Sequence, residues 1–327
     1  MEKRKLGYTD LNLTTIGLGT WAQGGNGWAF AWGAQDDRDS IAAIHRALDL
    51  GVNWIDTAAV YGFGHAEEVL GRALKGHRQD AIVATKCSRV WDEGNPFPYA
   101  SLKAESIRRE CENSLRRLGI DVIDLYQVHW PQPEQDLEEA WSTIADLIRE
   151  GKLRYAGVSN FNVGQIERVQ AIHPVASLQP PYSMLRRGAE DELLAYCASH
   201  DIGVVAYSPM QTGLLTGKFT RERVRNLPED DFRRDNTYYQ EPELSANLDL
   251  VEKLRPVAER NGHTLAQLAI AWVLRRPEVT SAIVGARRPS QIEETAPAAD
   301  WTLSDEDAAE IEGLLQEREV QLAEAAS

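Results

Sequence analysis

The sequence predicts an α/β protein of the (β/α)8 TIM-barrel class, with an N-terminal β-hairpin and an extra C-terminal helix. Eight short apolar runs alternate with longer amphipathic stretches between about residue 14 and residue 285. The runs are almost continuously apolar, which is typical of parallel strands buried on both faces. Because no Pro- or Ser-rich linker interrupts the alternation, we expect residues 1–327 to form a single barrel domain.

The predicted strands share a short apolar core followed by a polar residue. In chain order they are LTTIGLGT, VNWIDTA, AIVATK, IDLYQVHW, LRYAGVSN, PVASLQP, GVVAYSP and SAIVG. The predicted helices between them carry apolar residues three or four positions apart. They include residues 36–51, 101–119, 137–151, 189–201 and 264–277.

Two further segments do not belong to a minimal barrel. Residues 4–13, RKLGYTDLNL, predict a β-hairpin that closes the bottom of the barrel. Residues 216–245 are polar and contain proline, and a connection of that length is usually functional or mobile.

A doubly wound open sheet is the alternative fold. It is disfavoured because no G-x-G-x-x-G follows the first predicted strand.

Composition limits the possible partners and cofactors. A net charge of −15 disfavours nucleic acid and anionic membrane surfaces as partners. No apolar run approaches the roughly 20 residues that span a bilayer, and the N-terminus lacks the apolar region of a signal peptide. Three cysteines without a CxxC pair, Cys87, Cys111 and Cys197, argue against a disulfide framework and a zinc site. We therefore expect a cytoplasmic protein without a bound metal; the sequence carries no signal for an oligomeric state.

Polar side chains follow the predicted strands where the strands end. The carboxyl ends of barrel strands form the active-site face of this architecture. The residues at these ends are Thr20, Trp21, Asp56, Lys86, His129, Ser159, Asn160, Gln179, Tyr207, Ser208 and Gly285, with Arg287 and Arg288 after the last. Each alone is an ordinary strand end, but together they predict a ring of ionisable groups around one mouth.

Asp56, Lys86, His129 and Tyr61, which lies in the loop after Asp56, form a set with a defined chemistry. A free tyrosine has a pKa of about 10, and a nearby ammonium group lowers it. Asp56 would hold Lys86 charged beside Tyr61, and His129 would orient a carbonyl oxygen. This arrangement suits carbonyl reduction. Since side chains supply no hydride, a nicotinamide cofactor is implied.

The motifs IDTAAVYG, ATK, IDLYQVHWP, GVSNF, SLQPPYS and AYSPM…GLLTGK resemble the successive signatures of the aldo-keto reductases. They occur in that family's order over essentially the whole chain. The match is nearest to bacterial members related to the general stress and inositol-cluster reductases and to the potassium-channel β subunits. The resemblance implies a barrel, NADP(H) dependence, and the catalytic tetrad Asp56, Tyr61, Lys86 and His129, with Tyr61 as general acid and base.

The resemblance also implies a cofactor site. Ser159, Asn160 and Gln179 match positions that hold the nicotinamide carboxamide, and Tyr207 matches the ring that stacks on the nicotinamide. The remaining matching positions are Thr20, Trp21, Asp56, Ser208, Pro209, Met210, Gly213, Lys218, Arg233, Gly285, Arg287, Gln291 and Glu294. Arg287 and Arg288 favour the 2′-phosphate of NADP. Many members carry a lysine where this chain has Gly285, an arginine at Gln291 and an asparagine at Thr295.

Aromatic residues in Gly-rich and neighbouring loops predict the substrate pocket, because carbonyl pockets have apolar walls around few polar groups. They are Trp21, Trp28, Phe30, Trp32, Trp91, Trp130 and Tyr182. No cluster of Arg or Lys in the sequence marks an anionic substrate, and no particular carbonyl compound is identified.

Three functions are compatible with these residues. An NADP(H)-dependent reductase of aldehydes or ketones, of the alcohol-dehydrogenase type, agrees best with the tetrad. A cofactor-binding regulatory protein with incidental turnover is the alternative from another class. An aldolase that uses Lys86 as a Schiff base is a third, but it would give Tyr207, Asn160 and Gln179 no purpose.

Overall fold

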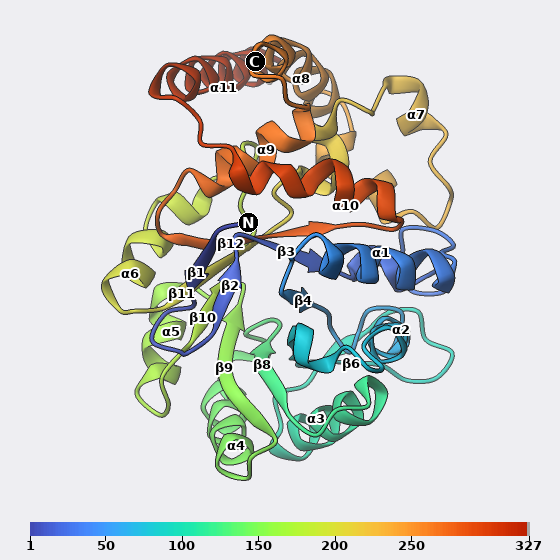
Figure 1. Cartoon of the computed structure of the whole chain (residues 1–327), viewed down its shortest axis with the longest axis vertical. Coiled ribbons are helices and arrows are strands. Elements are labelled where there is room, and N and C mark those ends of the chain that lie inside the picture. Colours follow the sequence, from blue (N-terminus) through green and yellow to red (C-terminus); the bar gives the residue numbers. More distant parts are fainter. Residues whose placement is uncertain (326–327) are drawn as a thin grey trace.

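The computed structural model describes residues 1–325, and its centre is a closed barrel of eight parallel strands (Figure 1). The strands follow one another around the barrel in the order β10-β11-β12-β3-β4-β5-β8-β9. They are β3 (Ile16–Gly19), β4 (Trp54–Asp56), β5 (Ile82–Cys87), β8 (Ile123–Val128), β9 (Leu153–Ser159), β10 (Ser177–Gln179), β11 (Gly203–Tyr207) and β12 (Val279–Gly285). Each overlaps one of the eight apolar runs, so the predicted barrel is confirmed.

The helices pack around this barrel. They are α1 (Asp37–Asp49), α2 (His65–Ala73), α3 (Ala104–Leu118), α4 (Leu137–Arg149), α5 (Val163–Gln170), α6 (Leu193–Ser199), α7 (Arg221–Arg225), α8 (Glu243–Arg260), α9 (Leu265–Leu274), α10 (Pro289–Thr295) and α11 (Asp305–Ala325). The five predicted helices correspond to α1, α3, α4, α6 and α9. Helix α11 is the predicted extra C-terminal helix and lies beside α8 (Figure 1). None of the helices in the described range is both long and apolar enough to cross a membrane.

The predicted hairpin closes the amino-terminal end of the barrel. Strands β1 (Lys3–Lys5) and β2 (Asn12–Thr14) pair antiparallel, and the hairpin's leucines Leu6, Leu11 and Leu13 are buried against residues of the barrel strands. Gly7 has φ +51°, and a Cβ there would lie 2.3 Å from the Asp201 carbonyl oxygen. Only glycine fits this turn. Because the hairpin covers the amino-terminal end of the barrel, the carboxyl ends of the strands form its open face.

A buried glutamate shapes the turn that leaves β5. Glu110 of α3 accepts hydrogen bonds from the Ser88 backbone N–H (2.9 Å) and the Ser106 hydroxyl (3.1 Å). Ser88 has a left-handed backbone (φ +79°) and leads into the short strand β6 (Arg89–Val90), which pairs with β7 (Tyr99–Ala100). Burial raises the pKa of Glu110 to about 8, so its carboxyl group is largely protonated at neutral pH.

We expect Glu110→Gln to reduce the pH dependence of stability. In the wild type the unfolded chain loses the Glu110 proton near pH 4.5 and the folded chain near pH 8, so the stability from this group is present at low pH and declines between these values. The decline is on the order of 4 kcal/mol. Glutamine keeps the bond to Ser88 and does not ionise. Thermal unfolding at pH 5 and pH 8 should therefore show a smaller difference in Tm for the variant; an unchanged difference would contradict the shift.

Candidate active site

The carboxyl ends of the strands surround a cavity of about 710 Å³. It extends from His129 and Trp130 after β8, past Tyr207 at the end of β11, to Arg287 before α10. Residues 216–245, predicted to be functional or mobile, form part of its wall through Phe219, Arg223, Phe232, Arg233, Asn236 and Tyr238. The long connection therefore contributes directly to the site.

Asp56, Lys86 and Tyr61 form one buried chain of polar contacts. The Lys86 Nζ donates to Asp56 Oδ1 (2.5 Å), the Thr57 carbonyl (2.8 Å) and Tyr61 Oη (3.4 Å). The other Asp56 oxygen accepts from the amides of Gln179 (2.8 Å) and Gln127 (3.3 Å). Each of the three Lys86 protons thus has an acceptor, and the ammonium is fixed against the phenol.

The pKa of Tyr61 departs from the expectation. The ammonium of Lys86 was expected to lower it, but burial raises the pKa of the phenol well above its usual value, and Asp56 and Tyr207 act in the same direction. Burial also lowers the pKa of Lys86, against the opposing effect of Asp56. Desolvation therefore outweighs the ammonium, and Tyr61 Oη retains its proton at neutral pH.

His129 lies beside the Tyr61 ring, with ring centroids 5.9 Å apart in an edge-on arrangement. Burial lowers the pKa of His129 well below its usual value, and the charges of Lys86 and Arg89 lower it further. The imidazole is therefore neutral and has one N–H to donate. Asp56, Tyr61 and His129 line the cavity, while Lys86 lies behind them and is 1 % exposed.

Amide side chains and one aromatic ring continue from the tetrad along the cavity. Asn160, which has φ +62°, accepts a hydrogen bond from the Tyr207 hydroxyl (2.9 Å) and donates to the His129 carbonyl (3.0 Å). The Ser159 hydroxyl donates to the Gln179 carbonyl (2.9 Å). These contacts fix Asn160, Tyr207, Ser159 and Gln179 along one wall.

The loop after β11 has an unusual backbone. Ser208, Gln211 and Thr212 all have φ between +46° and +56°, and Gly213 has φ +98°. Such strain is usually kept where a loop must meet a ligand. The predicted residues Pro209, Met210, Gly213 and Lys218 line the cavity with Ser208, and Lys218 forms an ion pair with Glu294 of α10.

At the far end of the cavity, the Arg287 side chain binds the loop that contains Trp32, Ala34 and Gln35. Its guanidinium donates to Gln35 Oε1 (2.6 Å), to the Trp32 carbonyl (3.1 Å) and to the Ala34 carbonyl. Its backbone N–H donates to Gln291 Oε1 (2.7 Å). Arg287 therefore joins α10 to the aromatic loop, while the neighbouring Arg288 is exposed.

The residues present fit a nicotinamide dinucleotide. Amide groups and the Tyr207 ring suit a carboxamide-bearing heterocycle, and Lys218, Arg233 and Arg287 place positive charge along the same cavity. A Cβ at Gly285 would meet only the Gly19 carbonyl, at 4.0 Å, so the chain leaves room there. Across residues 1–325, no group of three or more His, Cys, Asp or Glu side chains is arranged to hold a metal ion.

The aromatic wall of the cavity is formed by Trp21, Trp28, Phe30, Trp32 and Trp130, as predicted. Trp21 and Trp32 pack edge-on with ring centroids 5.3 Å apart. Phe232, from residues 216–245, packs against both rings at 4.8 Å and 5.1 Å. A segment more than 200 residues further along the chain thereby completes the pocket.

Besides Lys86, which lies behind the cavity wall, three predicted site residues do not line the cavity. Trp91 stacks on Phe63 at 5.2 Å instead. Thr20 is fully buried and shares a hydrogen bond with Thr57 (2.8 Å). Tyr182 is also fully buried; it packs on Trp272, and its hydroxyl bonds to Glu190 and Arg275. These three side chains point away from the cavity, because side-chain direction at a turn does not follow from the strand pattern.

Conversely, the cavity also has lining residues that were not predicted from the sequence, among them Arg89, Arg186, Phe232 and Tyr238. Arg89 had a usable signal, since it follows Lys86 by three positions at a strand end. Arg186 is one of two adjacent arginines in MLRRG, and the sequence alone does not distinguish them.

Comparisons with known proteins agree with this geometry. Residues 15–316 match the model of the Aldo/keto reductase family. The chain is 39% identical to the aldo-keto reductase YhdN of Bacillus subtilis over 319 residues, 97% of this chain and 94% of that protein. It is 37% identical to the NADH-specific methylglyoxal reductase of Escherichia coli over 324 residues, 94% of this chain and 96% of that protein.

Among solved structures, the glycerol dehydrogenase AKR11B4 from Gluconobacter oxydans is similar, with a TM-score of 0.88 and 37% identity. The likeness covers 97% of this chain and 96% of that one. The sequence motifs, the closed barrel and the family match all extend over nearly the whole chain. The chain therefore belongs to the aldo/keto reductase family.

Proposed function

We propose that the protein is a nicotinamide-dependent oxidoreductase of the alcohol-dehydrogenase type that reduces aldehydes or ketones to alcohols, reversibly. The observation that carries this proposal is the contact between Lys86 Nζ and Tyr61 Oη beside His129, at one end of a cavity with amide groups and cations along its length. The printed names of the relatives, a methylglyoxal reductase and a glycerol dehydrogenase, support a small carbonyl compound or its alcohol as substrate.

Each tetrad residue has a distinct role in this proposal. A nicotinamide cofactor held by this cavity would supply the hydride that the side chains lack. His129, being neutral, donates its N–H to the carbonyl oxygen and orients it. Tyr61 transfers its hydroxyl proton to that oxygen, and Lys86 stabilises the phenolate that remains. Asp56 holds Lys86 in place, as do the Thr57 carbonyl and the buried surroundings.

The test is to incubate the protein with a panel of aldehydes and ketones and with either NADPH or NADH. Turnover is measured as the loss of absorbance of the reduced cofactor. Turnover of several carbonyl compounds supports the reductase. If the protein bound NADPH but oxidised it with none of them, the regulatory alternative would replace the proposal.

NADP(H) is the proposed cofactor. Arg233, Arg287 and Arg288 lie close enough that Arg233 and Arg288 both lower the pKa of Arg287, to which burial contributes most. Such a concentration of positive charge in a protein of net charge −15 favours an additional phosphate. One observation favours NADH instead, namely the 37% identity to a relative named as an NADH-specific reductase.

We expect Arg288→Ala to weaken NADPH binding about five- to tenfold while leaving NADH binding unchanged, because an exposed arginine gives a phosphate roughly 1 kcal/mol or slightly more. Arg287→Ala should weaken both cofactors, since it also releases the loop that contains Trp32 and Ala34. Fluorescence titration of both variants measures the effects. Equal losses for NADPH and NADH in Arg288→Ala would mean that Arg288 contacts no 2′-phosphate.

A further inference from the structure

Arg89 is a half-buried cation without a carboxylate partner. It lies on β6, lines the cavity, and stacks on the ring of Trp130 at 5.6 Å. Its Nη2 donates to the neutral amide of Gln132 (3.1 Å). Burial lowers the pKa of Arg89, and no carboxylate within residues 1–325 offsets this effect. A buried charge left uncompensated in this way is costly unless a ligand completes it.

Most other cations around the cavity have partners within the protein. The buried Lys86 and Arg233 pair with Asp56 and Asp231, and the exposed Lys218 pairs with Glu294. Arg287 forms no ion pair within residues 1–325, but its guanidinium donates to Gln35 and to two backbone carbonyls. Arg89 is also at the catalytic end, because it packs on the ring of Trp130, the residue that follows His129. It is therefore placed near the reacting carbonyl, away from the cationic residues Arg287 and Arg288 at the far end.

Arg186 adds a second unpaired cation at the rim of the same cavity. It lies near Tyr207, whose pKa burial raises and Arg186 partly lowers. Its backbone is fixed by two hydrogen bonds with Ser183, at 3.0 Å and 3.2 Å. Arg186 is an exposed residue whose side chain hydrogen-bonds with Tyr207, and within the described chain it forms no ion pair.

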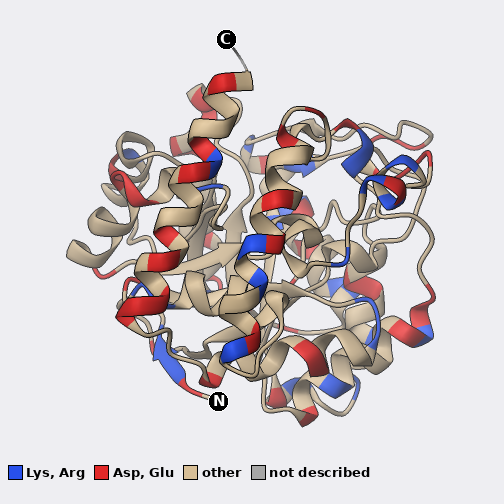
Figure 2. Cartoon of the chain, turned by 90° about the horizontal axis from the view of Figure 1, so that it is seen from above, with Lys and Arg blue, Asp and Glu red and all other residues tan. Residues whose placement is uncertain are grey.

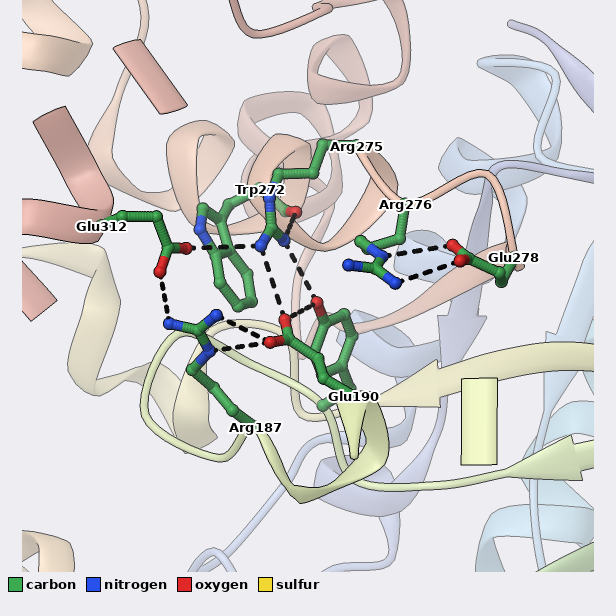
Figure 3. A network of polar contacts seen from close by, with 8 residues as sticks. Arg187, Glu190, Trp272, Arg275, Arg276, Glu278 and Glu312 are labelled. Carbon is green, nitrogen blue, oxygen red and sulfur yellow. Dashed lines mark hydrogen bonds and ion pairs between the residues drawn. The ribbon is translucent and has the colours of Figure 1, made fainter. Parts of the chain in front are cut away.

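The neighbouring Arg187 shows what a structural arginine in this loop does. Its guanidinium binds Glu190 (2.7 Å) and Glu312 of α11 (2.5 Å), and Arg275 joins the same two carboxylates over the face of Trp272 (Figure 3). This network anchors the loop to the C-terminal helix. Arg187 therefore binds the carboxylates that anchor this loop, whereas Arg186 pairs with no carboxylate of residues 1–325.

We propose that the preferred carbonyl substrates carry a carboxylate group, which Arg89 binds and which Arg186 attracts at the rim. The proposal rests on the reductase function above and narrows its substrate class. Guanidinium groups match carboxylates with two parallel hydrogen bonds, and the Trp130 ring holds the Arg89 plane in position. Acidic residues recur along the outer helices, so the two arginines provide local attraction against a repulsive background (Figure 2).

The experiment compares 4-carboxybenzaldehyde with its neutral methyl ester, using NADPH and the full-length protein. We expect kcat/KM to be at least tenfold higher for the carboxylate, mainly through a lower KM. Arg89→Gln should reduce this ratio at least fivefold, and Arg89→Lys should restore part of it because the charge returns. Arg186→Gln should reduce the ratio less and should make it less sensitive to salt.

Arg116→Gln is the matched control, because it removes one positive charge from an exposed site on α3, outside the cavity, and should leave the ratio unchanged. If the wild type reduces both aldehydes equally well, or if Arg89→Gln keeps the full ratio, the carboxylate site is wrong while the reductase function stands. If NADPH is bound but neither these aldehydes nor the carbonyl panel is turned over, the proposed function fails and the carboxylate site fails with it.

Discussion

Tyr61→Phe is expected to lower kcat for carbonyl reduction by roughly 10²- to 10⁴-fold, the range that one general acid contributes. The hydroxyl removed is the one that contacts Lys86 Nζ at 3.4 Å. The phenyl ring that stays keeps its packing against Trp21 and Trp28, with centroids 6.4 Å and 6.2 Å away. Cofactor affinity should therefore change little. Steady-state kinetics and fluorescence titration with NADPH measure the two quantities separately.

Tyr207→Phe is the matched comparison, because it removes a phenol hydroxyl from the same cavity without removing the proposed proton donor. It loses the hydrogen bonds of the Tyr207 hydroxyl with Asn160 and Arg186 but keeps the proton donor Tyr61, so we expect a much smaller decrease in kcat. Near-normal turnover by Tyr61→Phe, or equal losses in the two variants, would assign the proton transfer to another group.

The position of the tetrad could be predicted from the sequence because barrel geometry carries the information. Asp56 ends β4 and Lys86 lies in β5, the adjacent strand, where the register pairs Asp56 with Ala84. Lys86 lies two residues after Ala84 on β5, so it is at the same end of the barrel as Asp56. His129 follows β8, the next strand around. In a (β/α)8 barrel, the alternation of strands and helices along the sequence determines which strands are adjacent, so these neighbours can be predicted without knowing any side-chain position.

The pKa of Tyr61 and the direction of Tyr182 could not be predicted in the same way. Both depend on burial, which is a property of the whole packed structure. Tyr61 is 9 % exposed, and desolvation reverses the effect expected from Lys86. Tyr182 faces Trp272 and Arg275, which arrive from α9 and the residue after it, some 90 residues along the chain.

The cations at the substrate end of the cavity were not predicted, because their surroundings also depend on the packed structure. A charged residue gives no sequence signal for whether a carboxylate will be nearby. Arg186 and Arg187 are adjacent and chemically identical, yet only Arg187 meets Glu190 and Glu312. The sequence contains no cluster of cations that would mark an anionic substrate, because Arg89 and Arg186 line the same cavity only after folding.

Lys86→Met should destabilise the protein by about 3–5 kcal/mol, the usual effect of leaving one partner of a buried ion pair alone. Lys86 and Asp56 are 1 % and 3 % exposed, so water cannot replace the lost contact. The Asp56 carboxylate would retain the amide donors of Gln179 and Gln127, which places the expected loss toward the lower end of the range. Urea unfolding monitored by tryptophan fluorescence measures the change.

The double variant Asp56→Asn/Lys86→Met distinguishes lost charge pairing from lost packing. Asparagine still accepts from Gln179 through its side-chain oxygen and carries no charge, so the double variant should be more stable than Lys86→Met alone. Both should lack reductase activity, since neither keeps an ammonium beside Tyr61. A double variant no more stable than the single one would show that Lys86 contributes through packing, and that the buried pair serves Tyr61 without holding the barrel end together.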